Sequence, residues 1–429
     1  MLWGVSCYFN PSGYHQPLEN LQAFSDGVRG QGLHLAIVEL AIGAGPFVVD
    51  ASLCDRLIQL RTDEVLWHKE ALLNIGIEQL PDDCSGVCWL DADILFDNKA
   101  WVAETVAALD NFPVVQPFSH CTWLPPGVRS VPESLTVYPA MHDEFNRIHS
   151  FGFGWRNFGK HALEERILYG HVGFAWAARR ELVQAIRLYD GDIYAGSGDN
   201  FMAHAFVGHD AMLRVDGELY SAAMIRHFRQ WSSSAYQRVQ GEVGYVDGNV
   251  NHLWHGTSAN RRYLERLMLL RDSGFDPARH LIRCDNGLYE LVNAPDSLSI
   301  AVREYFDSRL EDSPPDNAGI CVFGPGFYDD EGDFRWSQQV SEMQIARDCD
   351  DWSFAISNNI LKSRGVKQRI DISRNGEDFK TLYLESNRKV TVEVGKVFTG
   401  DRFQFNSDFG FRPSDSGAAD HRNLSFMFW

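Results

Sequence analysis

Apolar runs alternate with helix-like segments along the first quarter of the chain, and this alternation restricts the fold more than any other feature. Residues 2–9, 33–40, 86–90 and 114–117 are strand-like apolar runs, whereas residues 18–30, 66–76 and 100–109 have helical apolar spacing. Strands that alternate with helices form a mostly parallel sheet covered by helices on both faces. Such sheets bind ligands at the carboxyl ends of their strands. The sequence therefore predicts an α/β domain with a ligand site at that edge.

The pattern of apolar residues changes after a proline-containing stretch at residues 313–318. Consecutive prolines with small polar neighbours predict an extended linker. Beyond it, short alternating runs are separated by Gly, Asn and Asp, which is typical of an all-β sandwich; they are residues 352–357, 367–373, 381–384, 389–394, 402–406 and 423–429. We therefore expect an α/β domain at 1–312, a linker at 313–318 and a β-sandwich domain at 319–429.

Composition narrows the class of partner and the compartment. The formal net charge is -19 and no stripe of Lys and Arg is evident, which argues against nucleic acid as a ligand. An acidic protein that approaches a diphosphate needs a cation as a bridge. The eight cysteines are scattered, as in reduced cytosolic proteins. Because no apolar run approaches about 20 residues, we expect no transmembrane segment and a cytoplasmic location.

An Asp-x-Asp string follows one of the apolar strands. Asp91 and Asp93 stand two residues apart, so their carboxylates point to the same side of the chain and can share one hard cation, Mn²⁺ or Mg²⁺. The string also occurs at 190–192 and 348–350. Only the first follows a buried strand within the alternating pattern. We therefore predict a metal site at Asp91 and Asp93.

The helix and strand around this string carry a resemblance to a known family. The run LWHKEALLNIG at 66–76, followed by WLDADI at 89–94, resembles the nucleotide-sugar region of family 2-like, GT-A-fold glycosyltransferases, and the resemblance covers residues 2–285. It implies that Lys69 and Asn74 lie near the nucleotide, together with Asp91. Glu39-Leu40-Ala41 replaces the usual acidic-acidic-Gly-Ser run, which makes Glu39 the candidate for the base and ribose contacts. Lys69 on a helix surface and a capping Asn74 are the plain alternatives.

A glycine-flanked acid supplies a candidate base. Gly196-Ser197-Gly198-Asp199-Asn200 resembles the Gly-Gly-Glu/Asp element of the family, whose acid activates the acceptor hydroxyl. The chemistry needs a carboxylate within hydrogen-bond reach of that proton, and glycines allow close approach. The alternative is an Asp199 that only caps the following helix.

Two histidines compete as the third metal ligand, and one tryptophan is a candidate for the sugar. His255, in the string NHLWHG at 251–256, resembles the histidine element near the end of these domains. His227 resembles the equivalent stretch in the galactosyltransferase branch; we favour His255. Trp176 lies in the run that shapes the sugar pocket of the fold, although a Trp in an apolar run is more often core.

Together these features predict a metal-dependent, inverting hexosyltransferase of polysaccharide biosynthesis. The expected donor is a UDP-sugar and the expected acceptor is a glycan or glycolipid, held in part by the β-sandwich domain. Two alternatives stay open. A nucleotidyltransferase needs a basic glycine-rich loop after the first strand, and residues 10–14 offer none. A non-catalytic carbohydrate-binding protein has no use for a strand-end Asp-x-Asp together with a glycine-flanked acid.

Overall fold

The protein comprises two compact units. The computed structural model describes residues 1–124, 128–129, 147–163, 169–209, 220–256, 259–312, 321–330, 335–345, 348–358, 367–384, 389–412 and 424–428. One unit, here the α/β unit, holds Met1–Leu124 and Ile148–Asp312. The other, here the β unit, holds Pro125–Arg147 and Ser313–Trp429. The predicted linker at 313–318 lies outside the described residues, and the predicted domain boundaries stay a prediction.

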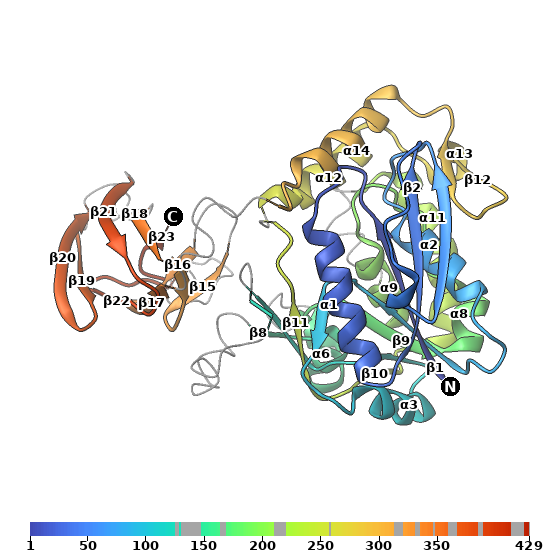
Figure 1. Cartoon of the computed structure of the whole chain (residues 1–429), viewed down its shortest axis with the longest axis horizontal. Coiled ribbons are helices and arrows are strands. Elements are labelled where there is room, and N and C mark those ends of the chain that lie inside the picture. The colour runs from blue at the N-terminus through green and yellow to red at the C-terminus, as the bar shows by residue number, and fades with distance from the viewer. Residues whose placement is uncertain are drawn as a thin grey trace. The chain divides into compact units, whose positions relative to one another are not determined.

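A seven-stranded sheet forms the centre of the α/β unit (Figure 1). Its order is β10-β6-β9-β4-β1-β2-β3, and β9 runs antiparallel to β4 and β6 while the other pairs are parallel. The strands are β1 Leu2–Phe9, β2 His34–Ile42, β3 Arg56–Thr62, β4 Gly86–Leu90, β6 Val114–Gln116, β9 Ala175–Arg179 and β10 Val243–Tyr245. The predicted α/β class is confirmed.

Both faces of the central strands β1, β2 and β4 are buried, which explains why these strands are largely apolar, whereas the edge strand β3 is partly exposed and mixes polar with apolar residues. Along β2, Ala36 and Val38 contribute to one hydrophobic cluster, whereas Leu35 and Ile37 contribute to another. Successive side chains of a strand point to opposite faces, so one strand serves two cores. The first core includes helices α2 Lys69–Glu78, α8 Arg180–Ile186, α9 Gly198–Phe206 and α11 Ala222–Val239, and the second includes α1 Gln16–Gly30 and α3 Trp101–Asn111.

A second, four-stranded sheet brings distant parts of the sequence together. Its order is β5-β11-β7-β8, with bounds Ile94–Phe96, Asn249–His252, His120–Trp123 and Arg147–His149. β11 pairs with β5 in antiparallel register, so that His252 lies opposite Ile94. Asp93, the residue before β5, and the end of β11 are therefore neighbours.

The rest of the α/β unit consists of short elements. They are the 3-10 turns Ala51–Leu53, Gly159–Leu163 and Ala259–Arg261, helices α6 Phe151–Phe158, α12 Tyr263–Asp272, α13 Pro277–His280 and α14 Asp296–Ser308, and the hairpin β12 Leu281–Arg283 with β13 Tyr289–Leu291. Among the described residues, no helix is both long and apolar enough to cross a membrane.

The β unit contains two antiparallel five-stranded sheets around one core, which confirms the predicted sandwich. One has the order β14-β17-β22-β19-β20 and the other β15-β16-β23-β18-β21. Phe405 of the first sheet packs edge-on against Phe354 of the second, with ring centroids 5.7 Å apart. The strands are β14 Cys321–Phe323, β15 Phe327–Asp330, β16 Arg335–Ser337, β17 Val340–Ile345, β18 Cys349–Ser357, β19 Gln368–Arg374, β20 Glu377–Leu384, β21 Val390–Val397, β22 Arg402–Ser407 and β23 Met427–Phe428.

Candidate metal and catalytic site

Asp91 and Asp93 emerge where the fully buried strand β4 ends. The Asp91 amide donates to the Phe174 carbonyl at 2.8 Å, which ties the string to the residue before β9. Phe174 adopts a φ of 75°, unusual for a residue other than glycine. Both aspartates remain partly open, with side-chain exposures of 25% and 23%. The string therefore lies at the carboxyl edge of the sheet, where a ligand can reach it.

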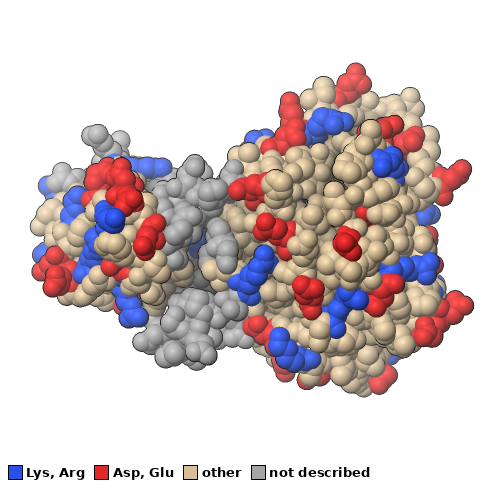
Figure 2. Space-filling model, in the orientation of Figure 1, with Lys and Arg blue, Asp and Glu red and all other residues tan. Residues whose placement is uncertain are grey.

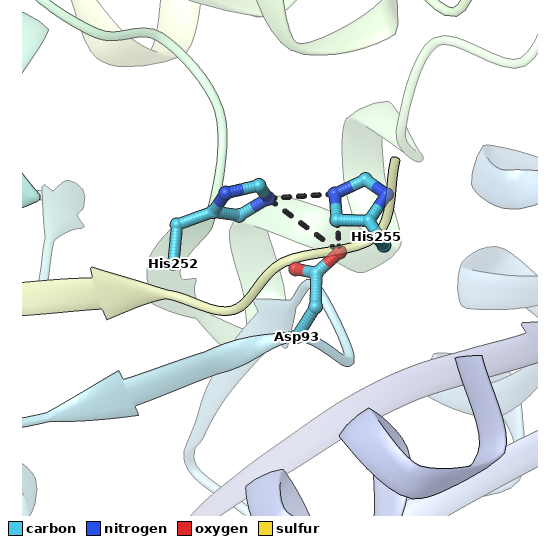
Figure 3. Close-up of side chains that lie close together, drawn as sticks. All are labelled: Asp93, His252 and His255. Carbon is cyan, nitrogen blue, oxygen red and sulfur yellow. Dashed lines mark hydrogen bonds and ion pairs between the residues drawn. The ribbon is translucent and has the colours of Figure 1, made fainter. Parts of the chain in front are cut away.

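Three side chains converge beside this edge: Asp93, His252 and His255 (Figure 3). Asp93 Oδ2 lies 3.1 Å from His255 Nε2 and 3.7 Å from His252 Nε2, and the two Nε2 atoms are 2.8 Å apart. The pairing of β11 with β5 produces this arrangement, together with a hydrogen bond of 2.7 Å from the Leu253 amide to the Asp93 carbonyl. Their ligand atoms all lie within 4.8 Å of one another, as a shared metal ion requires.

The donor set and its polar environment fit a cation. Asp93 Oδ1 is buried and has no hydrogen-bond partner among the described residues, although a buried carboxylate oxygen normally has one. Burial alone would raise the pKa of Asp93, but the adjacent His252 holds it below its ordinary value, so the carboxylate is charged. Imidazole suits transition metals, whereas Mg²⁺ prefers oxygen ligands.

An aromatic stack orients one of these histidines. The Phe174 ring stacks on His252, with centroids 4.8 Å apart, and on its other side stacks on His171 at 3.9 Å. Since Phe174 also accepts the Asp91 amide, one residue supports both the Asp-x-Asp string and a candidate ligand.

A lysine links the other aspartate to the predicted base. Lys69 Nζ, from the start of α2, lies 2.6 Å from Asp91 Oδ1 and 2.8 Å from Asp199 Oδ2. Burial would lower the pKa of Lys69, but Asp199 and Asp91 hold it well above its ordinary value, so it stays charged. Burial raises the pKa of Asp91 to about 6, although Lys69 opposes the change. Among the described residues, Asp91 is therefore a partner of Lys69 and not a member of the converging metal group.

The loop before α9 is shaped to present Asp199. Asp192 is buried and accepts hydrogen bonds from the amides of Tyr194, Ala195 and Ser197 at 3.1, 2.8 and 2.7 Å. A side chain at Gly198 would overlap the buried carboxyl group of Glu70, so glycine is required there. The second Asp-x-Asp string, at 190–192, thus anchors the loop.

Four predicted site residues lie away from this cluster or are committed elsewhere. Glu39 is 1% exposed; its Oε1 accepts the Val48 and Val49 amides and its Oε2 accepts the Gln59 amide group, so it anchors a loop. Asn74 is buried; its side-chain NH2 donates hydrogen bonds to the Leu188 carbonyl and to Asp190 Oδ2, and its Oδ1 accepts one from the Leu188 amide. These partners occupy the polar atoms that a nucleotide would need, so neither Glu39 nor Asn74 is part of the proposed nucleotide site.

The other two are Trp176 and His227. Trp176 is 0% exposed and its indole NH donates to the Val172 carbonyl at 2.7 Å, so it has no free face for a sugar. His227 lies on α11, where its Nδ1 is 3.1 Å from the Tyr189 hydroxyl, and it is not among the converging ligands. Packing and hydrogen bonding within the protein explain both side chains, so neither is part of the proposed site.

His252 is the site residue that sequence reasoning missed. The signal was present as His-x-x-His at the end of a strand-like run, residues 249–255.

The charge on the surface is mixed. On the visible face of the α/β unit, the described Lys and Arg side chains are interspersed with Asp and Glu (Figure 2).

Comparison with known proteins gives likeness of fold alone. No protein-family model matches the chain, and no curated protein matches it. Solved structures that resemble it include residues 1–349 of TarS from S. aureus in complex with UDP-GlcNAc, at 12% identity and a TM-score of 0.32, covering 65% of this chain and 74% of that one. Another is glucosyl-3-phosphoglycerate synthase from Mycobacterium tuberculosis with Mn²⁺, UDP and phosphoglyceric acid, at 11% identity and a TM-score of 0.27, covering 75% and 82%.

A third is 4-diphosphocytidyl-2C-methyl-D-erythritolsynthase from Anaerococcus prevotii, at 12% identity and a TM-score of 0.29, covering 58% of this chain and 87% of that one.

Proposed function

We propose that the α/β unit is a glycosyltransferase that binds a nucleotide-sugar diphosphate through a divalent cation, Mn²⁺ in preference to Mg²⁺. The observation that carries the proposal is the convergence of Asp93, His252 and His255 at the carboxyl edge of the sheet. Lys69, Asp91 and Asp199 form a second group of charged side chains, in which the lysine pairs with both aspartates. A cation site next to an ammonium group suits a ligand with two phosphates.

The site residues have separate roles in this proposal. Asp93 and the two histidines would hold the cation, which would supply neutralisation of the charge that builds on a departing diphosphate. Lys69 holds Asp199 in place through Oδ2, which leaves Oδ1 to take the proton of the acceptor hydroxyl. The acceptor oxygen bonds to the anomeric carbon as the bond to the diphosphate breaks. A base on the side opposite the leaving group implies inversion.

The finer assignments extend this proposal. The donor is a UDP-sugar and the acceptor is a glycan or glycolipid met in the cytoplasm during polysaccharide synthesis. With the domains divided at 312 and 319, the β-sandwich domain holds the acceptor and raises its effective concentration at the site.

A panel of nucleotide sugars tests the proposal. The full chain is incubated with each donor, with Mn²⁺ or with EDTA, and released nucleotide is quantified. We expect metal-dependent release of a nucleoside diphosphate from at least one donor, and an inverted anomeric product by NMR once an acceptor is found. Release of pyrophosphate from nucleoside triphosphates would indicate a nucleotidyltransferase. Sugar binding without any turnover would indicate a carbohydrate-binding protein.

A further inference from the structure

The last residues of the α/β unit lie beside His255 of the candidate metal site. After α14, Glu311 lies buried at 7% side-chain exposure, with its Oε1 3.4 Å from His255 Nδ1. The other ring nitrogen, Nε2, is the one that lies 3.1 Å from Asp93. A group at the far nitrogen of a ligand histidine helps to fix the orientation of its ring.

Two arginines share the same carboxylate. Arg261 Nη1 donates to Glu311 Oε1 at 3.2 Å and Arg309 Nε donates at 2.8 Å. Arg261 Nη2 also contacts Nδ1 and the carbonyl oxygen of His255. Two guanidinium groups this near to a divalent cation repel it unless a carboxylate offsets them. Glu311 is placed to provide that offset.

The first loop of the chain holds this terminal segment in position. Asp312 Oδ1 accepts the amides of His15 and Gln16, both at 2.8 Å, at the N-terminus of α1. Asp307 Oδ1 accepts the Ser12 hydroxyl at 2.6 Å, and the Leu310 amide donates to the Tyr14 hydroxyl at 3.1 Å. Glu311 is thus fixed from both sides and not left on a free tail.

We propose that Glu311 is the positioning residue of the metal site, which orients His255 and offsets the charge of Arg261 and Arg309. This inference rests on the metal-binding part of the proposed function and does not depend on which sugar is transferred.

The test is the Mn²⁺ affinity of Glu311→Gln, measured on the full chain by calorimetry and by the EPR signal of free Mn²⁺. The amide keeps the size of the side chain and removes its charge. We expect the dissociation constant to rise about 10- to 100-fold, as for other residues that support a ligand histidine. The matched control is Glu304→Gln on the exposed face of α14, which should bind Mn²⁺ as the wild type does.

The outcomes separate a positioning role from a structural one. Lower thermal stability with an unchanged Mn²⁺ dissociation constant would overturn the inference. Should the glutamine variant not fold, Glu311→Asp decides, because it keeps the charge but withdraws it from Nδ1: weaker Mn²⁺ binding supports the inference and equal binding overturns it. A wild type that binds Mn²⁺ but no nucleotide sugar would remove the proposed transfer and leave the role of Glu311 standing.

Discussion

The chain carries Asp-x-Asp in two very different settings. Asp91 and Asp93 follow a buried strand of the α/β unit, with 25% and 23% of their side chains exposed. In the β unit, Asp350 is 87% exposed and pairs with Lys396, and Asp348 accepts the Thr399 amide at 2.7 Å. Water screens the second pair, whereas the first lies where charge is costly unless it meets a partner. The same motif therefore marks a candidate site in one unit and the exposed start of strand β18 in the other.

The difference extends to the two cores. Among the described residues, the buried charged side chains all belong to the α/β unit; they are Glu39, Glu70, Asp192, Arg261, Arg266 and Glu311. The buried polar residues described in the β unit are serines, Asn358 and Gln368, which are uncharged. Burying a charged side chain costs free energy, and buried charges are concentrated at functional sites. A domain without such a site can bury uncharged polar groups instead. The predictions below test this contrast.

Asp93→Asn should have the largest effect. It removes the charged ligand that lies near both histidines, so Mn²⁺ affinity measured by calorimetry should fall more than about 100-fold. Asp350→Asn is the matched control from the β unit and should bind Mn²⁺ like the wild type. Equal affinities for the two variants would remove the contrast between the motifs.

Asp199→Asn should lower the rate of transfer about 100-fold, the usual scale for loss of a general base, with little change in donor affinity. Single-turnover kinetics measures the first and calorimetry the second. Asp26→Asn, an exposed helical aspartate on α1, is the control. If turnover by the Asp199 variant matched that of the control, Asp199 would serve only as the ion-pair partner of Lys69, and the proposed mechanism would be wrong.

Acid should unfold the α/β unit before the β unit. Burial lowers the pKa of His68 to about 4 and of His204 to about 3, from 6.5. The unfolded chain then binds more protons than the folded chain below about pH 6.5, so stability falls as pH falls through that window. The loss is on the order of 2 kcal/mol per histidine at about pH 5.

Hydrogen exchange of peptides from each unit at about pH 7 and pH 5 measures this loss. His204→Gln should flatten the pH dependence of the α/β unit. Earlier loss of protection in the β unit would contradict the assignment.

Asn358→Ala should have the smallest effect and should be confined to the β unit. The Asn358 side chain donates to Gln368 Oε1 at 3.0 Å and to the Ser425 carbonyl at 2.5 Å. Leaving buried partners unpaired costs about 1–3 kcal/mol of unfolding free energy, measured with denaturant. Tyr383→Ala, at a side chain 65% exposed, is the control and should change stability by less than about 0.5 kcal/mol. A change in Mn²⁺ affinity in either variant would show that the units are coupled.

The sequence by itself determined the architecture. Alternation of apolar and helical segments predicted the α/β sheet, and short alternating runs predicted the sandwich, because burial on one face or two leaves a local periodic signature. It also predicted Asp93 and His255 as candidates, since a strand-end aspartate and a histidine beside glycine are local features, and the structure places the two side chains together.

Only the tertiary structure decided which side chains meet. Glu39, Asn74 and Trp176 lie in segments that suggested binding, yet their neighbours in space occupy their polar atoms or bury their surface. Conversely, His252 joins Asp93 because β11 pairs with β5, and Glu311 reaches His255 because Asp312 is held at the start of α1. These contacts join residues far apart in the chain, and local spacing carries no information about a pairing that depends on how whole elements pack.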